Sequence, residues 1–178
     1  MADIGSGTGI FTRQLRASLP VTIPILGIEP ASDMRREAQT RSPVQSGIEY
    51  LDGTAESIPL AAESVRAVVA ATAAHWFHRP AYYNEARRTL MPFGVMAIVE
   101  YVRDEEASPA AAAVVDFLKN FGGPRAYAPP DYEAELGTAM AFLDFQSTIE
   151  SVTLQLTPCE FLGLALSSSH ARAAIQTL

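Results

Sequence analysis

The residues with the clearest chemical purpose are the three glycines that alternate with other residues in the segment Asp3–Gly9 (sequence DIGSGTG). Glycine loses more backbone freedom on folding than any other residue, so such a run is kept where φ must be positive or where a ligand approaches the main chain. The residues before it are typical of a strand, and those after it place Phe11, Leu15 and Leu19 at helical spacing. This strand, turn and helix N-terminus predict a site for a nucleotide-like ligand.

Two classes of ligand use such a turn, and the glycine spacing separates them. A nicotinamide-dinucleotide site has the pattern G-x-G-x-x-G, which needs a glycine at position 10, where the chain has Ile10. The chain instead has D-x-G-x-G-x-G, formed by Asp3, Gly5, Gly7 and Gly9. In this pattern it resembles the class I S-adenosylmethionine-dependent methyltransferases.

Glu29 and three further stretches strengthen the resemblance. Glu29 follows the glycine turn by about 20 residues, at the predicted end of the second strand, where a carboxylate can accept hydrogen bonds from two ribose hydroxyls. Thr54–Pro59 is similar to the family's segment after the third strand. Ala71–Phe77 is similar to the segment after the fourth strand in the small-molecule branch called methyltransferase type 11. Met91–Gly94 loosely matches the family's R-P-G-G turn.

The resemblance implies S-adenosylmethionine as the cofactor. Asp3 would organise the turn that holds the amino-acid end of the donor, Glu29 would bind the ribose, and the segment after the third strand would border the adenine. The cofactor-binding residues that it implies are Asp3, Gly5, Ser6, Gly7, Gly9, Glu29, Pro30, Met34, Asp52, Thr54, Ala55, Glu56 and Thr72.

Methyl transfer from a sulfonium is an in-line displacement of a leaving group that its own charge has activated, so the protein mainly aligns donor and acceptor. We therefore expect no metal. An oxygen or nitrogen acceptor that must lose a proton needs a general base, and His75 is the candidate by residue type and position. The alternative that His75 is a packed, hydrogen-bonded wall residue stays open. Trp76 and Phe77 could shape an apolar acceptor pocket.

The fold class predicted is α/β, a Rossmann-like, doubly wound and mostly parallel sheet with the ligand at the carboxyl ends of the strands. We expect one domain over residues 1–178, with a donor-binding βα core at 1–101 and acceptor-side helices and antiparallel strands at 102–178. Strands are expected at 1–4, 25–28, 48–51, 65–71, 95–99, 145–150 and 152–156. Helices are expected at 10–19, 32–41, 80–90, 108–121 and 131–140, and from 158 onward.

The composition of the chain limits the classes of molecule that it is expected to bind. The formal net charge of −7 and a pI near 4.9 disfavour nucleic acid, because its binding depends on clustered Lys and Arg. The longest apolar runs are too short to span a bilayer, which argues against a membrane partner. Cys159 is the only cysteine, so we expect a reducing, cytoplasmic compartment.

The resembling family has several tens of residues before its glycine turn, whereas Asp3 is the third residue here. We therefore expect a chain truncated at its N-terminus, with a missing last strand at the C-terminus left open. The function expected is methyl transfer to an unknown small-molecule acceptor. One alternative is a non-catalytic remnant or interaction module that self-associates through the surface left by the missing segments. The other is a nicotinamide-dinucleotide-binding protein.

Overall fold

The structure, a computed structural model, describes residues 1–101, 106, 108–121, 130–138, 142 and 144–166. Its described residues fall into two compact units. The first lies within residues 1–101 and 131–145, and the second within 102–130 and 146–178. Each unit is considered by itself.

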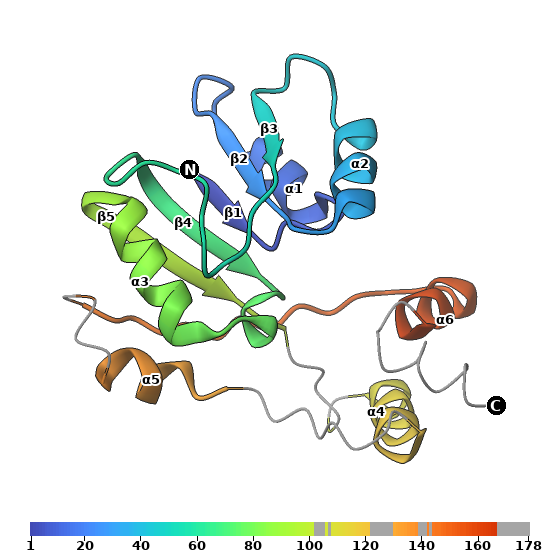
Figure 1. The fold of residues 1–178 in the computed structure, drawn as a ribbon. Coiled ribbons are helices and arrows are strands. Elements are labelled where there is room, and N and C mark those ends of the chain that lie inside the picture. Colours follow the sequence, from blue (N-terminus) through green and yellow to red (C-terminus); the bar gives the residue numbers. More distant parts are fainter. Residues whose placement is uncertain (102–105, 107, 122–129, 139–141, 143, 167–178) are drawn as a thin grey trace. The chain divides into compact units, whose positions relative to one another are not determined.

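The first unit contains a parallel sheet in the order β3-β2-β1-β4-β5 (Figure 1). This confirms the predicted α/β, Rossmann-like class. The strand order reverses between β1 and β4, and ligands of such sheets bind outside the carboxyl ends of the strands at this point. The strands are β1 (Ala2–Ile4), β2 (Ile25–Ile28), β3 (Ile48–Leu51), β4 (Val65–Ala71) and β5 (Leu90–Val99).

Helical crossovers join β1 to β2, β2 to β3 and β4 to β5, whereas residues 52–64 join β3 to β4 without a helix. The helices of these crossovers are α1 (Ile10–Ser18), α2 (Ser32–Arg41), the short 3₁₀ helix η1 (Ala74–Trp76) and α3 (Arg79–Thr89). A later helix, α5 (Tyr132–Thr138), also belongs to this unit. Arg79 on α3 donates two hydrogen bonds of 2.7 Å to the carboxylate of Glu135 on α5, and the Tyr83 hydroxyl adds a third at 2.9 Å. A bidentate, charge-assisted contact therefore fixes α5 against α3.

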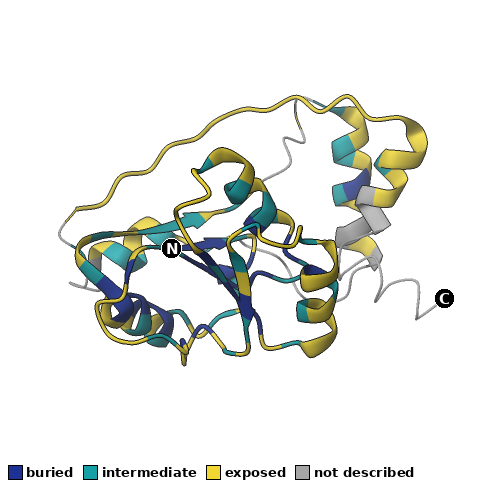
Figure 2. Ribbon diagram, turned by 90° about the horizontal axis from the view of Figure 1, so that it is seen from above, coloured by how far each residue is buried: buried dark blue, intermediate teal, exposed yellow. Residues whose placement is uncertain are grey.

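The core lies on the central strands, which Figure 2 shows largely in dark blue. Ala2 and Ile4 of β1, Ile25 and Ile28 of β2, and Val68 of β4 are fully buried. Such continuous burial is typical of parallel strands covered on both faces. It holds the carboxyl ends of β1, β2 and β4, where the predicted site lies, in a rigid frame.

In the second unit the structure has helices α4 (Pro109–Phe121) and α6 (Pro158–Leu166), as predicted. Ser108 caps α4, since its Oγ accepts a hydrogen bond of 3.3 Å from the backbone N–H of Ala111. Residues 144–157 have neither helix nor strand, so the strands predicted at 145–150 and 152–156 are not formed. Ile149 is 93% exposed and Val152 is 79% exposed. Alternating apolar residues predict which side chains share a face, but a strand also needs a paired edge.

The turn predicted at Met91–Gly94 is a bulge inside β5, which begins at Leu90 rather than at Val95. Val65 pairs with Leu90 and Ala67 with Val95, so the bulge absorbs the extra residues of β5. Phe93 has a φ of 61° there and is 96% exposed. A bulky side chain in the left-handed region is strained, and this one gains almost no packing in return.

We expect Phe93→Gly to raise the free energy of unfolding by about 1 kcal/mol, because glycine adopts this φ without strain. Urea denaturation would measure it. The control is Val44→Gly, which also removes an exposed apolar side chain but at a position without positive φ. That change should lower stability by up to about 1 kcal/mol through backbone entropy. Equal effects of the two substitutions would show that Phe93 is not strained.

Candidate functional site

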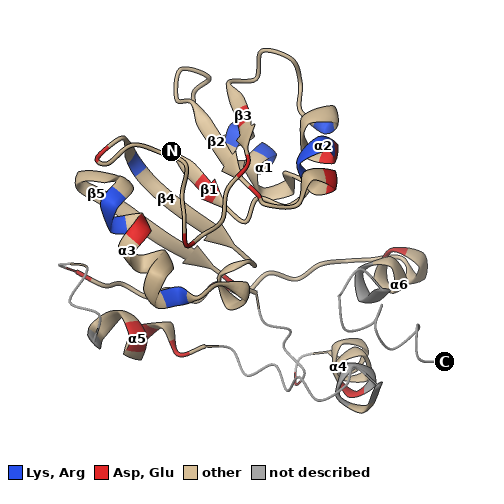
Figure 3. Ribbon diagram, viewed as in Figure 1, with Lys and Arg blue, Asp and Glu red and all other residues tan. Residues whose placement is uncertain are grey.

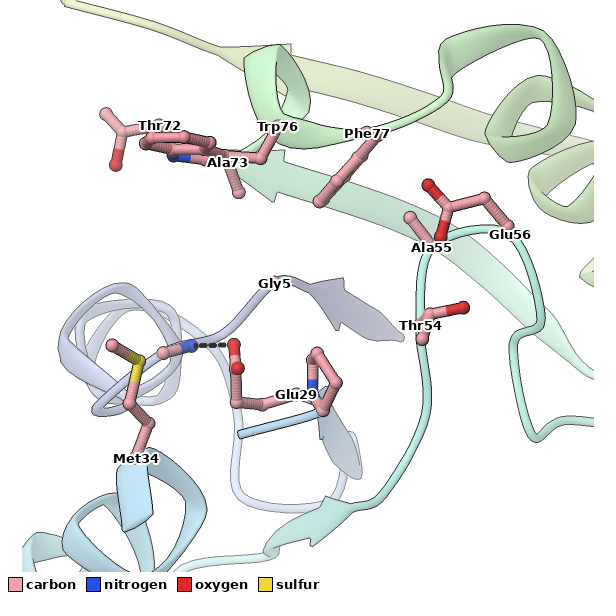
Figure 4. Close-up of a pocket in the computed structure, with 12 residues that line it drawn as sticks. Gly5, Glu29, Met34, Thr54, Ala55, Glu56, Thr72, Ala73, Trp76 and Phe77 are labelled. Carbon is pink, nitrogen blue, oxygen red and sulfur yellow. Dashed lines mark hydrogen bonds between the residues drawn. The ribbon is translucent and has the colours of Figure 1, made fainter. Parts of the chain in front are cut away.

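A cleft of about 380 Å³ opens at the carboxyl ends of the strands, entirely within the first unit (Figure 4). Its walls come from the turns after β1, β2, β3 and β4. The lining residues are Gly5, Gly7, Glu29, Pro30, Met34, Thr54, Ala55, Glu56, Thr72, Ala73, Trp76 and Phe77. The structure thus brings together nine of the predicted cofactor-binding residues, namely all of these except Ala73, Trp76 and Phe77.

The glycine turn after β1 requires its glycines for two different reasons. Gly5 has a φ of 70°, and a Cβ there would lie 2.7 Å from the Cβ of Ala73, so the opposite wall packs directly on its backbone. Gly7 has a φ of 54°, yet a Cβ there would meet nothing within 4 Å. The main chain at Gly7 is therefore open on the side where a ligand can approach.

The Glu29 carboxylate bridges two turns of the cleft. Its Oε2 accepts a hydrogen bond of 3.0 Å from the backbone N–H of Gly7 (Figure 4). Its Oε1 accepts one of 2.9 Å from the N–H of Ala31. Glu29 is 7% exposed. A carboxylate oxygen has room for two hydrogen bonds, so both oxygens keep acceptor capacity for a ligand.

Asp3 does not line the cleft but lies behind the glycine turn. It is buried, and its Oδ2 accepts a hydrogen bond of 2.6 Å from the hydroxyl of Thr12, which is also buried. Burial raises the pKa of Asp3 to about 6, and the hydrogen bond from Thr12 opposes this rise only in part. Asp3 thus ties β1 to α1.

Three other predicted residues also fail to line the cleft. Ser6 is buried, and its Oγ has no hydrogen-bond partner among the described residues. Gly9 closes the turn, since its N–H donates to the carbonyl of Ser6 at 2.9 Å. Asp52 is an exposed residue whose Oδ1 lies 3.0 Å from Nη1 of Arg35. Each of them shapes a turn from outside the cleft.

The wall opposite Glu29 is apolar (Figure 4). It consists of Ala73, Trp76 and Phe77, at and beside η1. The ring of Phe77 packs edge-on against buried Tyr82 with ring centres 5.0 Å apart, which fixes its orientation. Trp76 is 55% exposed, so much of its ring is accessible. Sequence reasoning missed Ala73, which has only a methyl group and no chemical signal.

His75 is not among the cleft-lining residues. Its Nδ1 lies 3.2 Å from Oε1 of Glu100, and the hydroxyl of Tyr132 on α5 donates to the same oxygen at 2.9 Å. This hydrogen-bonded cluster joins η1, the end of β5 and α5. The predicted role of His75 as a general base stays a prediction.

The charged side chains that line the cleft are all acidic. Glu29 and Glu56 are its charged members, and the described residues that line it include no Lys, Arg or His. Partial burial raises the pKa of Glu56, but hydrogen bonds to its carboxylate outweigh this effect and hold the pKa below its usual value. These bonds come from the backbone N–H of His78, at 2.8 Å, from the backbone of Glu56 itself and from the side chain of Thr54. Glu56 is therefore ionised at neutral pH, and the cleft favours a cationic ligand.

Residues 2–98 match the family model of the methyltransferase domain, which is more than half of the chain. The chain belongs to this methyltransferase family. Within the described residues, this methyltransferase domain has no group of three potential metal ligands and no helix with the length and apolarity needed to cross a bilayer.

Curated relatives of the domain include the malonyl-[acyl-carrier protein] O-methyltransferase of Methylococcus capsulatus, 36% identical over 98 residues that make up 54% of this chain and 35% of the relative. An uncharacterised methyltransferase of Mycobacterium tuberculosis is 34% identical over 103 residues, 58% of this chain and 40% of the relative. The chain spans two fifths or less of the length of these proteins.

Two solved structures match nearly the whole chain. The YcgJ protein of Bacillus subtilis has a TM-score of 0.66 at 19% identity, covering 98% of this chain and 74% of that one. A protein of Anaeromyxobacter dehalogenans described as a type II methyltransferase has a TM-score of 0.64 at 26% identity, covering 99% and 73%. The predicted class I methyltransferase fold is confirmed.

The burial of Asp3 predicts a pH dependence of stability. The folded-state pKa of about 6 lies above the ordinary value of 3.8, so the folded state keeps a proton that the unfolded state has released. Stability should fall as the pH rises from about 4 to about 6, by up to about 3 kcal/mol. In Asp3→Asn this fall should vanish, since the amide oxygen can still accept from Thr12.

Urea denaturation of the wild type and Asp3→Asn between pH 4 and pH 7 would measure this difference. The variant should gain stability relative to the wild type at the higher pH values. The matched control is Asp144→Asn at an exposed position, which should give no such gain. Parallel stability curves for Asp3→Asn and the wild type would contradict the account.

Proposed function

We propose that the cleft binds S-adenosylmethionine and that the domain transfers its methyl group to a small-molecule acceptor by in-line displacement. The observation that carries the proposal is the position of the buried Glu29 carboxylate beside the open backbone of Gly7, in a cleft whose charged lining is acidic. Such a cleft offers acceptors for ribose hydroxyls, and its described lining residues supply no cation for a phosphate.

Charge distinguishes the two candidate ligands. S-Adenosylmethionine has a sulfonium, an ammonium and a single carboxylate, so its net charge is positive. A nicotinamide dinucleotide has a pyrophosphate, which would lie close to Glu29 and Glu56 without a described cationic side chain in the lining. Because an unpaired anion in a partly enclosed site is costly, the lining favours the methyl donor.

Each wall of the cleft has a part in this proposal. Glu29 would accept hydrogen bonds from the ribose hydroxyls, and Thr54, Ala55 and Glu56 would border the adenine. The open backbone at Gly7 would receive the amino-acid end of the donor. Trp76 and Phe77 would shield the reacting methyl group from water and face the acceptor.

The sulfonium is already an activated leaving group, so alignment supplies most of the catalysis. For an acceptor that must lose a proton, His75 remains the proposed base. Its contact with Glu100, which Tyr132 shares, would fix the orientation of the imidazole ring. The acceptor would approach along the wall formed by Trp76, which is half exposed.

One observation favours the alternative of a self-associating interaction module. Among the strands that the structure describes, β5 lies at one edge of the sheet, and it contains no charged residue. Phe93 is 96% exposed and Val95 is 61% exposed on this strand. An uncharged edge can pair with another copy, and the bulge at Met91–Gly94 leaves Val95–Val99 as the part of β5 suited to such pairing. A monomer by sedimentation that methylates any acceptor would exclude this alternative.

Glu29→Ala should weaken binding of S-adenosylhomocysteine, the demethylated donor, by about tenfold or more, because hydrogen bonds to a charged group contribute roughly 1.5 to 3 kcal/mol. Isothermal titration calorimetry would measure the dissociation constant. Glu37→Ala, on the exposed part of α2 where Glu37 pairs with Arg41, serves as the matched control and should leave the affinity unchanged. Unchanged affinity in Glu29→Ala would remove Glu29 from the site.

A further inference from the structure

Arg35 contacts oxygen atoms at the ends of two strands just behind the cleft. Its Nη1 lies 2.6 Å from the carbonyl oxygen of Glu29, 2.8 Å from that of Pro30 and 3.0 Å from Oδ1 of Asp52. Glu29 and Pro30 line the cleft, whereas Arg35 does not. One guanidinium nitrogen therefore fixes the turn that follows β2 and links it to the residue after β3.

The position of Arg35 is unfavourable for the helix that carries it. Arg35 lies near the N-terminus of α2, where the helix dipole favours negative charge, and Figure 3 shows that α2 carries several basic residues. The side chain is only 17% exposed, so its charge is also partly desolvated. The hydrogen bonds from the guanidinium to the carbonyl oxygens of Glu29 and Pro30 offset this cost. Both of these residues line the cleft.

We propose that Arg35 is a positioning residue for the ribose of the donor. It holds the main chain of Glu29 and Pro30 so that the Glu29 carboxylate reaches the N–H of Gly7 and presents its remaining acceptor sites to the cleft. Arg35 acts through Glu29 and touches no ligand. The inference rests on the proposed function.

The two carbonyls, rather than Asp52, carry this effect. The Asp52 side chain is 73% exposed, and exposed ion pairs contribute little. An arginine that follows a strand-end carboxylate has another known use, which is to bind the 2′-phosphate of NADP. Arg35 is outside the cleft lining and its Nη1 is engaged with carbonyl oxygens, which opposes that use.

Calorimetric titration of the full chain with S-adenosylhomocysteine tests the proposal. Arg35→Met should weaken binding by about tenfold. Arg35→Lys should recover to within about threefold of the wild type, because an ammonium offers three donors to the same three oxygens. Asp52→Asn should also stay within about threefold. Adding Arg35→Met to Glu29→Gln should weaken binding by less than about twofold more, since both changes remove the same interaction.

Arg88 on α3 provides a matched control, because it also holds two carbonyls. Its guanidinium donates at 2.8 Å to the carbonyl oxygens of Leu60 and Ile58 and pairs with Glu85, and none of these residues lines the cleft. Arg88→Met should lower the melting temperature as Arg35→Met does, yet keep the affinity for S-adenosylhomocysteine within about twofold of the wild type.

Undiminished binding by Arg35→Met, or an equal loss in Arg88→Met, would overturn the inference while leaving the proposed function intact. Binding of NADPH by the wild type that Arg35→Met abolishes would overturn it in favour of a phosphate-binding role. If Arg35→Met does not fold, Arg35→Gln replaces it as the single variant and in combination with Glu29→Gln, and additive losses there would contradict coupling through Glu29. A wild-type chain that does not bind S-adenosylhomocysteine would refute the proposed function and this inference with it.

Discussion

The site depends on the carboxylate of Glu29, which holds two turns of different strands at a fixed separation. Its oxygens accept backbone N–H groups from Gly7, after β1, and from Ala31, before α2. Both N–H groups belong to segments that lead into helices, where donors lack partners within the helix. The buried carboxylate of Glu29 thus provides hydrogen-bond acceptors for both backbone N–H groups and sets the distance between the two turns.

The glycine turn makes this contact possible. Gly5 lets the wall at Ala73 pack onto the backbone, and the open side of Gly7 leaves its main chain accessible. Asp3 supports the turn from behind through Thr12, at the cost of burying a carboxyl group. Glu29, Gly7 and the acidic rim at Glu56 together make a cleft that suits a cationic, ribose-containing ligand better than a pyrophosphate.

The sequence predicted the five parallel strands and most of the cleft because strand ends and glycine turns have strong local signals. It could not tell residues that line the cleft from those beside it: Asp3, Ser6, Gly9 and Asp52, predicted with the others to bind the cofactor, lie outside the lining. Which side of a turn faces a cavity depends on packing between distant segments. The strands expected at 145–156 failed for a related reason, since alternation cannot reveal whether a partner edge exists.

Arg35 shows what local patterns miss. In the sequence it is one arginine among several on a polar helix, and nothing in its spacing suggests a role. Only the fold reveals that its guanidinium reaches back to the carbonyls of Glu29 and Pro30. Glu100 is a second example, because it contacts His75 and Tyr132 only once β5 and α5 are in place.

The central claim is that the cleft selects the cationic methyl donor over a dinucleotide. Calorimetric titration of the wild-type chain with S-adenosylmethionine and, in the same buffer, with NADH tests this most directly. The account predicts that S-adenosylmethionine binds at least about tenfold more tightly, because Glu29 and Glu56 oppose a pyrophosphate. Equal or tighter binding of NADH would contradict it.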